Sequence, residues 1–156
     1  MSDQLLIRPA NEDDCEFIAG LVPSLLEFVS PAWDDATSFA PGFRDVLVNA
    51  VRGQDAQSIV LIAQGADGTP LGFISVKLGE DVVGTVRAHV ADLAVTAGAR
   101  RVGVGTALMS AAEAWARERG LPAISLDVWS TNERAQAFYR RLGYGAESLH
   151  LLKRLD

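Results

Sequence analysis

The chain has little cysteine, little histidine and less positive than negative charge. Cys15 is its one cysteine, so no disulfide can form within the chain. Two histidines and one cysteine are too few for a structural zinc site without carboxylate ligands, and we expect no bound metal. Fourteen basic residues face twenty acidic ones, and the net charge of −6 disfavours non-specific binding to nucleic acid.

Long apolar runs are also missing. No stretch approaches the ~20 consecutive apolar residues that span a bilayer, so we expect no membrane partner. The first ten residues lack the basic segment followed by an apolar stretch that is typical of a secretion signal, which favours a cytoplasmic location. A length of 156 residues suits one domain over residues 1–156. The oligomeric state stays open, a homodimer included.

Hydrophobic periodicity predicts an α/β fold, with a mixed α+β sheet. Strands are expected at 5–10, 58–65, 71–80, 85–95, 123–129 and 147–155. Helices are expected at 11–28 (kinked or split at Pro23), 44–53 and 105–119, with a last helix opened by a Ser130–Glu133 capping box and closed by Gly143. Strand 85–95, helix 105–119 and strand 123–129 form a right-handed crossover, which makes the two strands parallel.

The strand at 85–95 changes its apolar phase. Val86, Ala88 and Val90 follow a period of two, and the pattern then jumps to Leu93 and Val95. A three-residue step between residues on one face indicates a β-bulge near Ala91–Asp92. The alternative is a strand buried on both faces near its end, where the phase carries no information.

A glycine loop, RRVGVGTALM at 100–109, precedes the alanine-rich helix. A Walker A loop is excluded because Gly105 is followed by threonine rather than lysine. A dinucleotide fingerprint would need a small residue where Leu108 stands, and more parallel strands than the chain supplies. The remaining interpretation is an acyl-coenzyme A pyrophosphate site, made of backbone N–H groups, a helix N-terminus and two arginines. A plain tight connection stays open as the alternative.

This loop resembles the Arg/Gln-x-x-Gly-x-Gly/Ala motif of the GNAT superfamily of N-acetyltransferases, matched at Arg100, Gly103 and Gly105. The segment NERAQAFYRRLGY is similar to the second signature of that family, matched at Asn132, Ala135, Phe138, Tyr139, Gly143 and Tyr144. The proline and aromatic residue that often precede the arginine are absent from TAGARR. The resemblance implies a GNAT-like fold: a mixed sheet of six to seven strands, helices on both faces and a splayed parallel strand pair. It also implies an N-acetyltransferase that uses acetyl-coenzyme A (acetyl-CoA).

In this family acetyl-CoA enters between the splayed strands, where its amide-rich arm pairs with free backbone groups and a free N–H at the bulge polarises the thioester carbonyl. The implied cofactor-binding residues are Leu93, Ala94, Val95, Arg100, Arg101, Val102, Gly103, Val104, Gly105, Thr106, Asn132, Ala135 and Phe138.

The resemblance implies catalytic residues as well. Tyr139 matches the general-acid position, where its hydroxyl would protonate the departing thiolate. The alternative is a core aromatic on an amphipathic helix. The general base is left open between His89, Asp92 and Glu80, the acids acting through water.

The resemblance also implies an acceptor pocket built by the first helices and the loops between strands. Candidate substrate-binding residues are Trp33, Phe39, Phe43, Glu80, Asp127 and Trp129. Aromatic and acidic side chains suit a cationic amine, so the expected reaction acetylates a small-molecule amine. A peptide N-terminus or a protein lysine stays open as the acceptor, as does a non-catalytic acyl-CoA-binding module.

Overall fold

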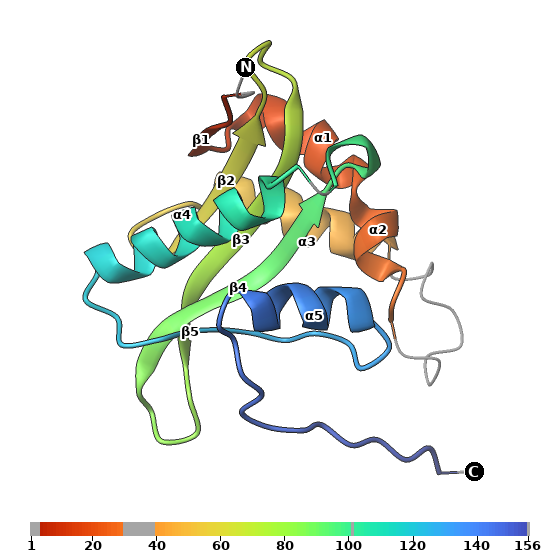
Figure 1. Ribbon diagram of the computed structural model, residues 1–156, viewed down its shortest axis with the longest axis vertical. Coiled ribbons are helices and arrows are strands. Elements are labelled where there is room, and N and C mark those ends of the chain that lie inside the picture. Colours follow the sequence, from red (N-terminus) through yellow and green to blue (C-terminus); the bar gives the residue numbers. More distant parts are fainter. Residues whose placement is uncertain (1–3, 30–39, 101, 156) are drawn as a thin grey trace.

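The computed structural model describes residues 4–29, 40–100 and 102–155. Within these ranges one sheet holds five strands in sequence order: β1 (Leu6–Pro9), β2 (Ser58–Gln64), β3 (Pro70–Glu80), β4 (Val86–Val95) and β5 (Ile124–Leu126). Neighbours from β1 to β4 are antiparallel, whereas β5 runs parallel to β4 (Figure 1). The predicted parallel pair is therefore confirmed.

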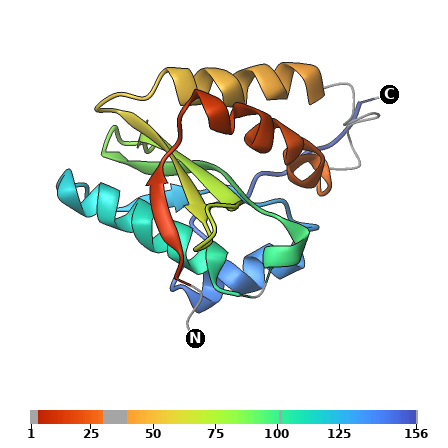
Figure 2. The ribbon, with the colours of Figure 1, turned by 90° about the horizontal axis from the view of Figure 1, so that it is seen from above.

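Helices cover both faces of the sheet (Figure 2). On one face lie α1 (Cys15–Gly20), α2 (Val22–Leu26) and α3 (Ala40–Arg52), and on the other lie α4 (Val104–Glu118) and α5 (Glu133–Arg141). Two short 3-10 helices, η1 (Glu12–Asp14) and η3 (Ala97–Ala99), precede α1 and α4. The predicted first helix is split at Leu21, with Pro23 in the first turn of α2, where its missing N–H costs nothing.

Alternation along β2 builds two apolar cores. Leu61 and Ala63 pack toward α4, whereas Val60 and Ile62 pack toward α1 and α3. The side chains of β2 alternate between the two faces, and both faces are buried, which explains why the whole segment is apolar in the sequence. The sheet is thus the middle layer of three.

The predicted bulge lies in β4. Val76 pairs with Val90 and Ser75 pairs with Asp92, so Ala91 is the extra residue. The extra residue exchanges the two faces of the strand. Val90 belongs to the core on the α4 side, whereas Ala94, four residues later, belongs to the core on the α3 side. The bulge therefore redirects every side chain after residue 91.

Four predictions about the sheet and the last helix were wrong. The segment 147–155 is not a strand, since no strand lies beside it in the described chain, and the sheet has five strands instead of six to seven. The strand at 123–129 is paired only over Ile124–Leu126, because β5 diverges from β4 beyond that point. Asn132, rather than Ser130, caps α5, since its side chain accepts a hydrogen bond from the Ala135 N–H.

None of the helices in the described residues combines the length and hydrophobicity that crossing a bilayer requires.

A largely buried ion pair fixes the start of the chain. Arg8 donates to both carboxylate oxygens of Asp14, at 2.7 and 2.8 Å, and the Asp14 side chain is 7% exposed. Asp14 also accepts from the Asn11 N–H, which completes the capping box of η1. The Arg8 guanidinium holds the pKa of Asp14 below its usual value, so this stabilisation is present at neutral pH and is lost as the pH falls through the lowered pKa.

We expect Asp14→Asn to lower the free energy of unfolding at pH 7 by about 2 to 3 kcal/mol, because it removes a charged, bidentate and poorly hydrated interaction. Urea denaturation measures this change. The control is Glu12→Gln, which breaks the exposed pair with Arg52 and should leave the midpoint nearly unchanged. Equal effects of the two substitutions would contradict the assignment.

Candidate functional site

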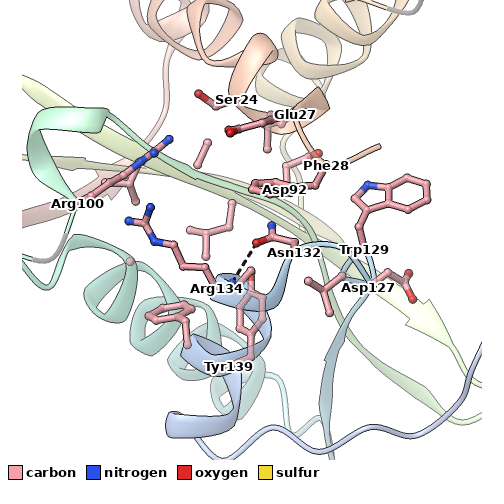
Figure 3. A pocket seen from close by; sticks show the side chains of 18 of the residues that line it. Ser24, Glu27, Phe28, Asp92, Arg100, Asp127, Trp129, Asn132, Arg134 and Tyr139 are labelled. Carbon is pink, nitrogen blue, oxygen red and sulfur yellow. Dashed lines mark hydrogen bonds between the residues drawn. The ribbon is translucent and has the colours of Figure 1, made fainter. Parts of the chain in front are cut away.

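A cavity of about 1410 Å³ opens where β5 separates from β4. Pairing between these strands ends at Val90 and Leu126, and the bulge at Ala91 turns the rest of β4 away. The walls come from α2 and the residues after it, the end of β4, the glycine loop, residues 127–129 and α5 (Figure 3). The splayed parallel pair expected from the sequence is therefore present, and it frames a cavity.

One wall is a bare strand edge. Leu93, Ala94 and Val95 line the cavity, and β3 pairs with them on one side only. Their backbone groups toward β5 have no strand partner, so a ligand with amide groups can satisfy them.

The glycine loop forms one end of the cavity. Gly103 has a φ of +84°, which favours glycine, and it is the N-cap of α4 without a side-chain hydrogen bond to the first turn. The first N–H groups of α4 therefore face the cavity uncapped, with the positive end of the helix dipole behind them. A Cβ on Gly105 would lie 3.2 Å from the Phe138 ring, so only glycine fits without a shift of that ring.

The structure places most predicted cofactor-binding residues on this cavity. Those in the lining are Leu93, Ala94, Val95, Arg100, Gly103, Val104, Gly105, Thr106, Asn132, Ala135 and Phe138. Val102 is 63% exposed and is not among them. Arg101 lies outside the described residues.

Two arginines stand together near the glycine loop. Figure 3 shows the side chain of Arg134 extending from α5 toward that of Arg100. In the part of the chain that the structure describes, no carboxylate forms an ion pair with either guanidinium group. The sequence analysis missed Arg134, although it stands inside the second signature between Asn132 and Ala135. This end of the cavity suits a polyanion such as a pyrophosphate.

A half-buried acid, Asp92, lies in the wall beside the bulge. The Oδ2 of Asp92 accepts a hydrogen bond from the Ser75 hydroxyl at 2.9 Å. Burial raises the pKa of Asp92 above the ordinary 3.8, and the Ser75 hydrogen bond opposes that rise. Asp92 lines the cavity on its β4 side.

Tyr139 lies across the cavity from Asp92, on α5 (Figure 3). Burial raises the pKa of its hydroxyl to about 12. Its ring packs at 5.2 Å from Phe138 and 5.9 Å from Tyr144, so the aromatic body belongs to the core. No described residue forms a hydrogen bond to the hydroxyl. Tyr139 is thus a core aromatic residue that also lines the cavity.

The other two candidates for a general base lie elsewhere. His89 is absent from the lining, its Nδ1 lies 3.0 Å from the Ser125 hydroxyl, and burial lowers its pKa. Its Nε2 lies 3.6 Å from the carboxylate of Asp127. Glu80 is the last residue of β3, pairs with Val86 and does not line the cavity either.

Acids and aromatics line the side of the cavity toward β5 and α2. Asp127 and Trp129 are there as predicted, and Phe43 of α3 joins them. Glu27 and Phe28, which follow α2, also line it, and no sequence pattern had marked them. Trp33 and Phe39 lie outside the described residues. A search of the described residues found no cluster of three or more metal-ligating side chains.

The sequence profile of the acetyltransferase (GNAT) family matches residues 22–144. Aminoglycoside N(6′)-acetyltransferase type 1 of Klebsiella aerogenes is 30% identical over 148 residues, which cover 92% of this chain and 91% of that protein. Streptothricin acetyltransferase of Streptomyces lavendulae is 36% identical over 96 residues, which cover 62% of this chain and 49% of that protein. A solved aminoglycoside N-acetyltransferase, AAC(6′)-Iy in complex with CoA, has the same fold, with a TM-score of 0.76 at 19% identity, covering 99% of this chain and 97% of that one.

Proposed function

The chain belongs to the acetyltransferase (GNAT) family, and from that premise we propose that it transfers the acetyl group of acetyl-CoA to a primary amine of a small, cationic molecule. The observation that carries this proposal is the division of one cavity into two ends. Arg100, Arg134 and the open N-terminus of α4 make a cationic end, and Glu27, Asp92 and Asp127 make an acidic side.

The cationic end fits the pyrophosphate of coenzyme A. Two arginines and the uncapped N–H groups after Gly103 supply donors, and the missing Cβ at Gly103, which would stand in open space, lets a phosphate approach the backbone. The bare edge at Leu93–Val95 would pair with the amides of the pantetheine arm. When bound, acetyl-CoA supplies an activated acyl group on sulfur.

Three groups of the chain would serve the transfer. Asp92 would accept the proton that the acceptor ammonium must lose before its nitrogen can attack the acetyl carbon. A backbone N–H freed by the bulge would stabilise the charge that develops on the carbonyl oxygen. As the carbon–sulfur bond breaks, Tyr139 would donate its proton to the departing sulfur.

The acidic side favours an acceptor with more than one positive charge. Glu27 and Asp127 can pair with ammonium groups, while Phe28 and Trp129 offer aromatic faces for cation–π contacts. Two of the similar proteins are named as aminoglycoside acetyltransferases, and aminoglycosides are small molecules of this kind.

Release of free thiol from acetyl-CoA, measured across a panel of acceptors, tests the proposal. We expect saturable turnover with small polyamines and aminoglycosides, and weaker turnover with monoamines and lysine peptides. Turnover restricted to peptides would overturn the acceptor class. Tight acetyl-CoA binding without turnover on any amine would favour a binding module instead.

We expect Gly103→Val to weaken acetyl-CoA binding by about tenfold or more, because valine strains the left-handed backbone and reorients the N–H groups at the start of α4. Isothermal titration calorimetry measures the affinity. Gly98→Val is the control, since this glycine has ordinary φ and open space around its Cβ. Equal affinity in both variants and the parent would make the loop a plain connection.

A further inference from the structure

One hydrogen bond joins two walls of the cavity that are far apart in the sequence. The Thr131 hydroxyl donates to the backbone carbonyl of Phe28 at 3.1 Å, across 103 positions of the chain. Phe28 follows α2, whereas Thr131 lies between β5 and α5. Within the described ranges, this is the one hydrogen bond or ion pair between residues 22–29 and residues 124–141.

This hydrogen bond lies at the acidic side of the cavity. Glu27 and Phe28 line the cavity from the wall after α2, and Asp127 and Trp129 line it from the wall after β5 (Figure 3). Thr131 does not line the cavity itself. It holds the backbone from which Glu27 and Phe28 project, and it therefore affects where these two side chains stand relative to Asp127.

The wall that carries Thr131 is braced independently of α2. Residues 129–132 form a turn, closed by a hydrogen bond from the Asn132 N–H to the Trp129 carbonyl at 2.9 Å. The Gln136 side chain of α5 donates to two carbonyls of the same turn, at 3.2 and 3.0 Å. The Thr131 hydroxyl is thus presented by a turn that α5 keeps in place.

The opposite wall depends more on the Thr131 hydroxyl. After α2 the chain makes one turn, in which the Val29 N–H donates to the Leu26 carbonyl at 3.2 Å. The hydrogen bond to Phe28 connects this turn to the braced wall. Thr131 is exposed, so water can replace its hydroxyl at the Phe28 carbonyl, and a variant without the hydroxyl should still fold.

We propose that Thr131 is a positioning residue for the acceptor, because its hydrogen bond to Phe28 sets the spacing between Glu27 on one wall and Asp127 on the other. An acceptor with several ammonium groups uses both carboxylates at once, whereas a monoamine uses one. A wall that is fixed before binding costs less to order, which favours the polyamine. This inference rests on the proposed function, since it concerns the acceptor side of the same cavity.

Thr131→Val tests this role, because valine keeps the shape of threonine and cannot donate. With coenzyme A bound, we expect the Kd for spermidine to rise about 3- to 10-fold, the effect of one hydrogen bond, and the Kd for butylamine to stay within about twofold. Isothermal titration calorimetry measures both. Thr131→Ser should restore the affinity for spermidine. The matched control is Ser130→Ala, which removes a neighbouring exposed hydroxyl that has no hydrogen-bond partner among the described residues.

A double-mutant cycle shows whether Thr131 acts through Glu27. Glu27→Gln removes one of the two charges, so Thr131→Val should raise the Kd for spermidine in the parent and leave it nearly unchanged in the Glu27→Gln background. Equal effects in both backgrounds would make the hydrogen bond a general structural contact and overturn the proposal. Equal effects on spermidine and butylamine would do the same.

Hydrogen exchange tests the link between the walls without any acceptor, and so separates this inference from the proposed function. Amides of residues 27–29 should exchange faster in Thr131→Val than in the parent, Thr131→Ser or Ser130→Ala. Unchanged exchange, with spermidine acetylated by the parent, would leave the proposed function standing and overturn the role of Thr131. A parent that neither binds nor acetylates spermidine would overturn the proposed acceptor class, and the positioning role with it.

Discussion

Replacing Tyr139 by phenylalanine should lower kcat by about 10²-fold or more and leave KM for acetyl-CoA within about twofold. The ring contacts with Phe138 and Tyr144 survive, so the change removes only the hydroxyl. With a pKa of about 12, that hydroxyl keeps its proton through any practical assay. The thiolate of a thiol with a pKa near 8.5 is a weaker base than the phenolate of Tyr139. The departing thiolate is nevertheless stabilised by a neighbouring donor while the carbon–sulfur bond breaks.

Tyr144→Phe is the matched control. Its hydroxyl donates to Glu113 at 3.1 Å, its ring packs on the same Tyr139, and it does not line the cavity. Steady-state kinetics should therefore show nearly unchanged kcat for this variant. Equal activity of Tyr139→Phe and the parent would leave Tyr139 as a packing residue, the alternative that its place on an amphipathic helix offered.

Side-chain patterns along the sequence predicted the β-bulge of β4 but not which strands have a neighbour in the sheet. The phase jump between Val90 and Leu93 located the bulge because side-chain alternation records which face each residue occupies. The leucine-rich segment 147–155 was also predicted to be a strand, and it is not one. A strand also needs a neighbour for its backbone groups, and alternation alone does not say whether the chain supplies one.

The site was predicted where a motif marks the backbone and missed where the fold brings distant residues together. Gly103 and Gly105 were found because a motif marks them, and each has a local reason to be glycine: a left-handed φ at Gly103 and the nearby Phe138 ring at Gly105. Glu27 lies some 65 positions before Asp92 in the sequence, and only the packing of α2 over the end of β4 brings both to one cavity. His89 precedes the bulge and does not line the cavity, whereas Asp92 follows the bulge and does.

Asp92→Asn should lower kcat by about 10²-fold and abolish the acid limb of the pH–rate profile. A carboxylate base works only when deprotonated, so the parent enzyme should lose activity as the pH falls through the raised pKa of Asp92. Profiles recorded with two acceptors of different basicity identify this limb, because it stays in place while the limb that belongs to the amine moves. A rise in KM with kcat unchanged would instead make Asp92 a binding site for the cationic acceptor.

Ser75→Ala tests the same assignment with the carboxylate left in place. The Ser75 hydroxyl donates to the ionised form of Asp92 and so lowers its pKa, which means that losing it raises the pKa further. The acid limb should therefore move to higher pH, while the rate on the plateau stays close to that of the parent. His89→Gln serves as the control and should keep the limb, because this histidine bonds to Ser125 outside the cavity. If the acid limb is lost in His89→Gln and does not move in Ser75→Ala, the histidine is the base, and the bulge serves only to shape the cavity wall.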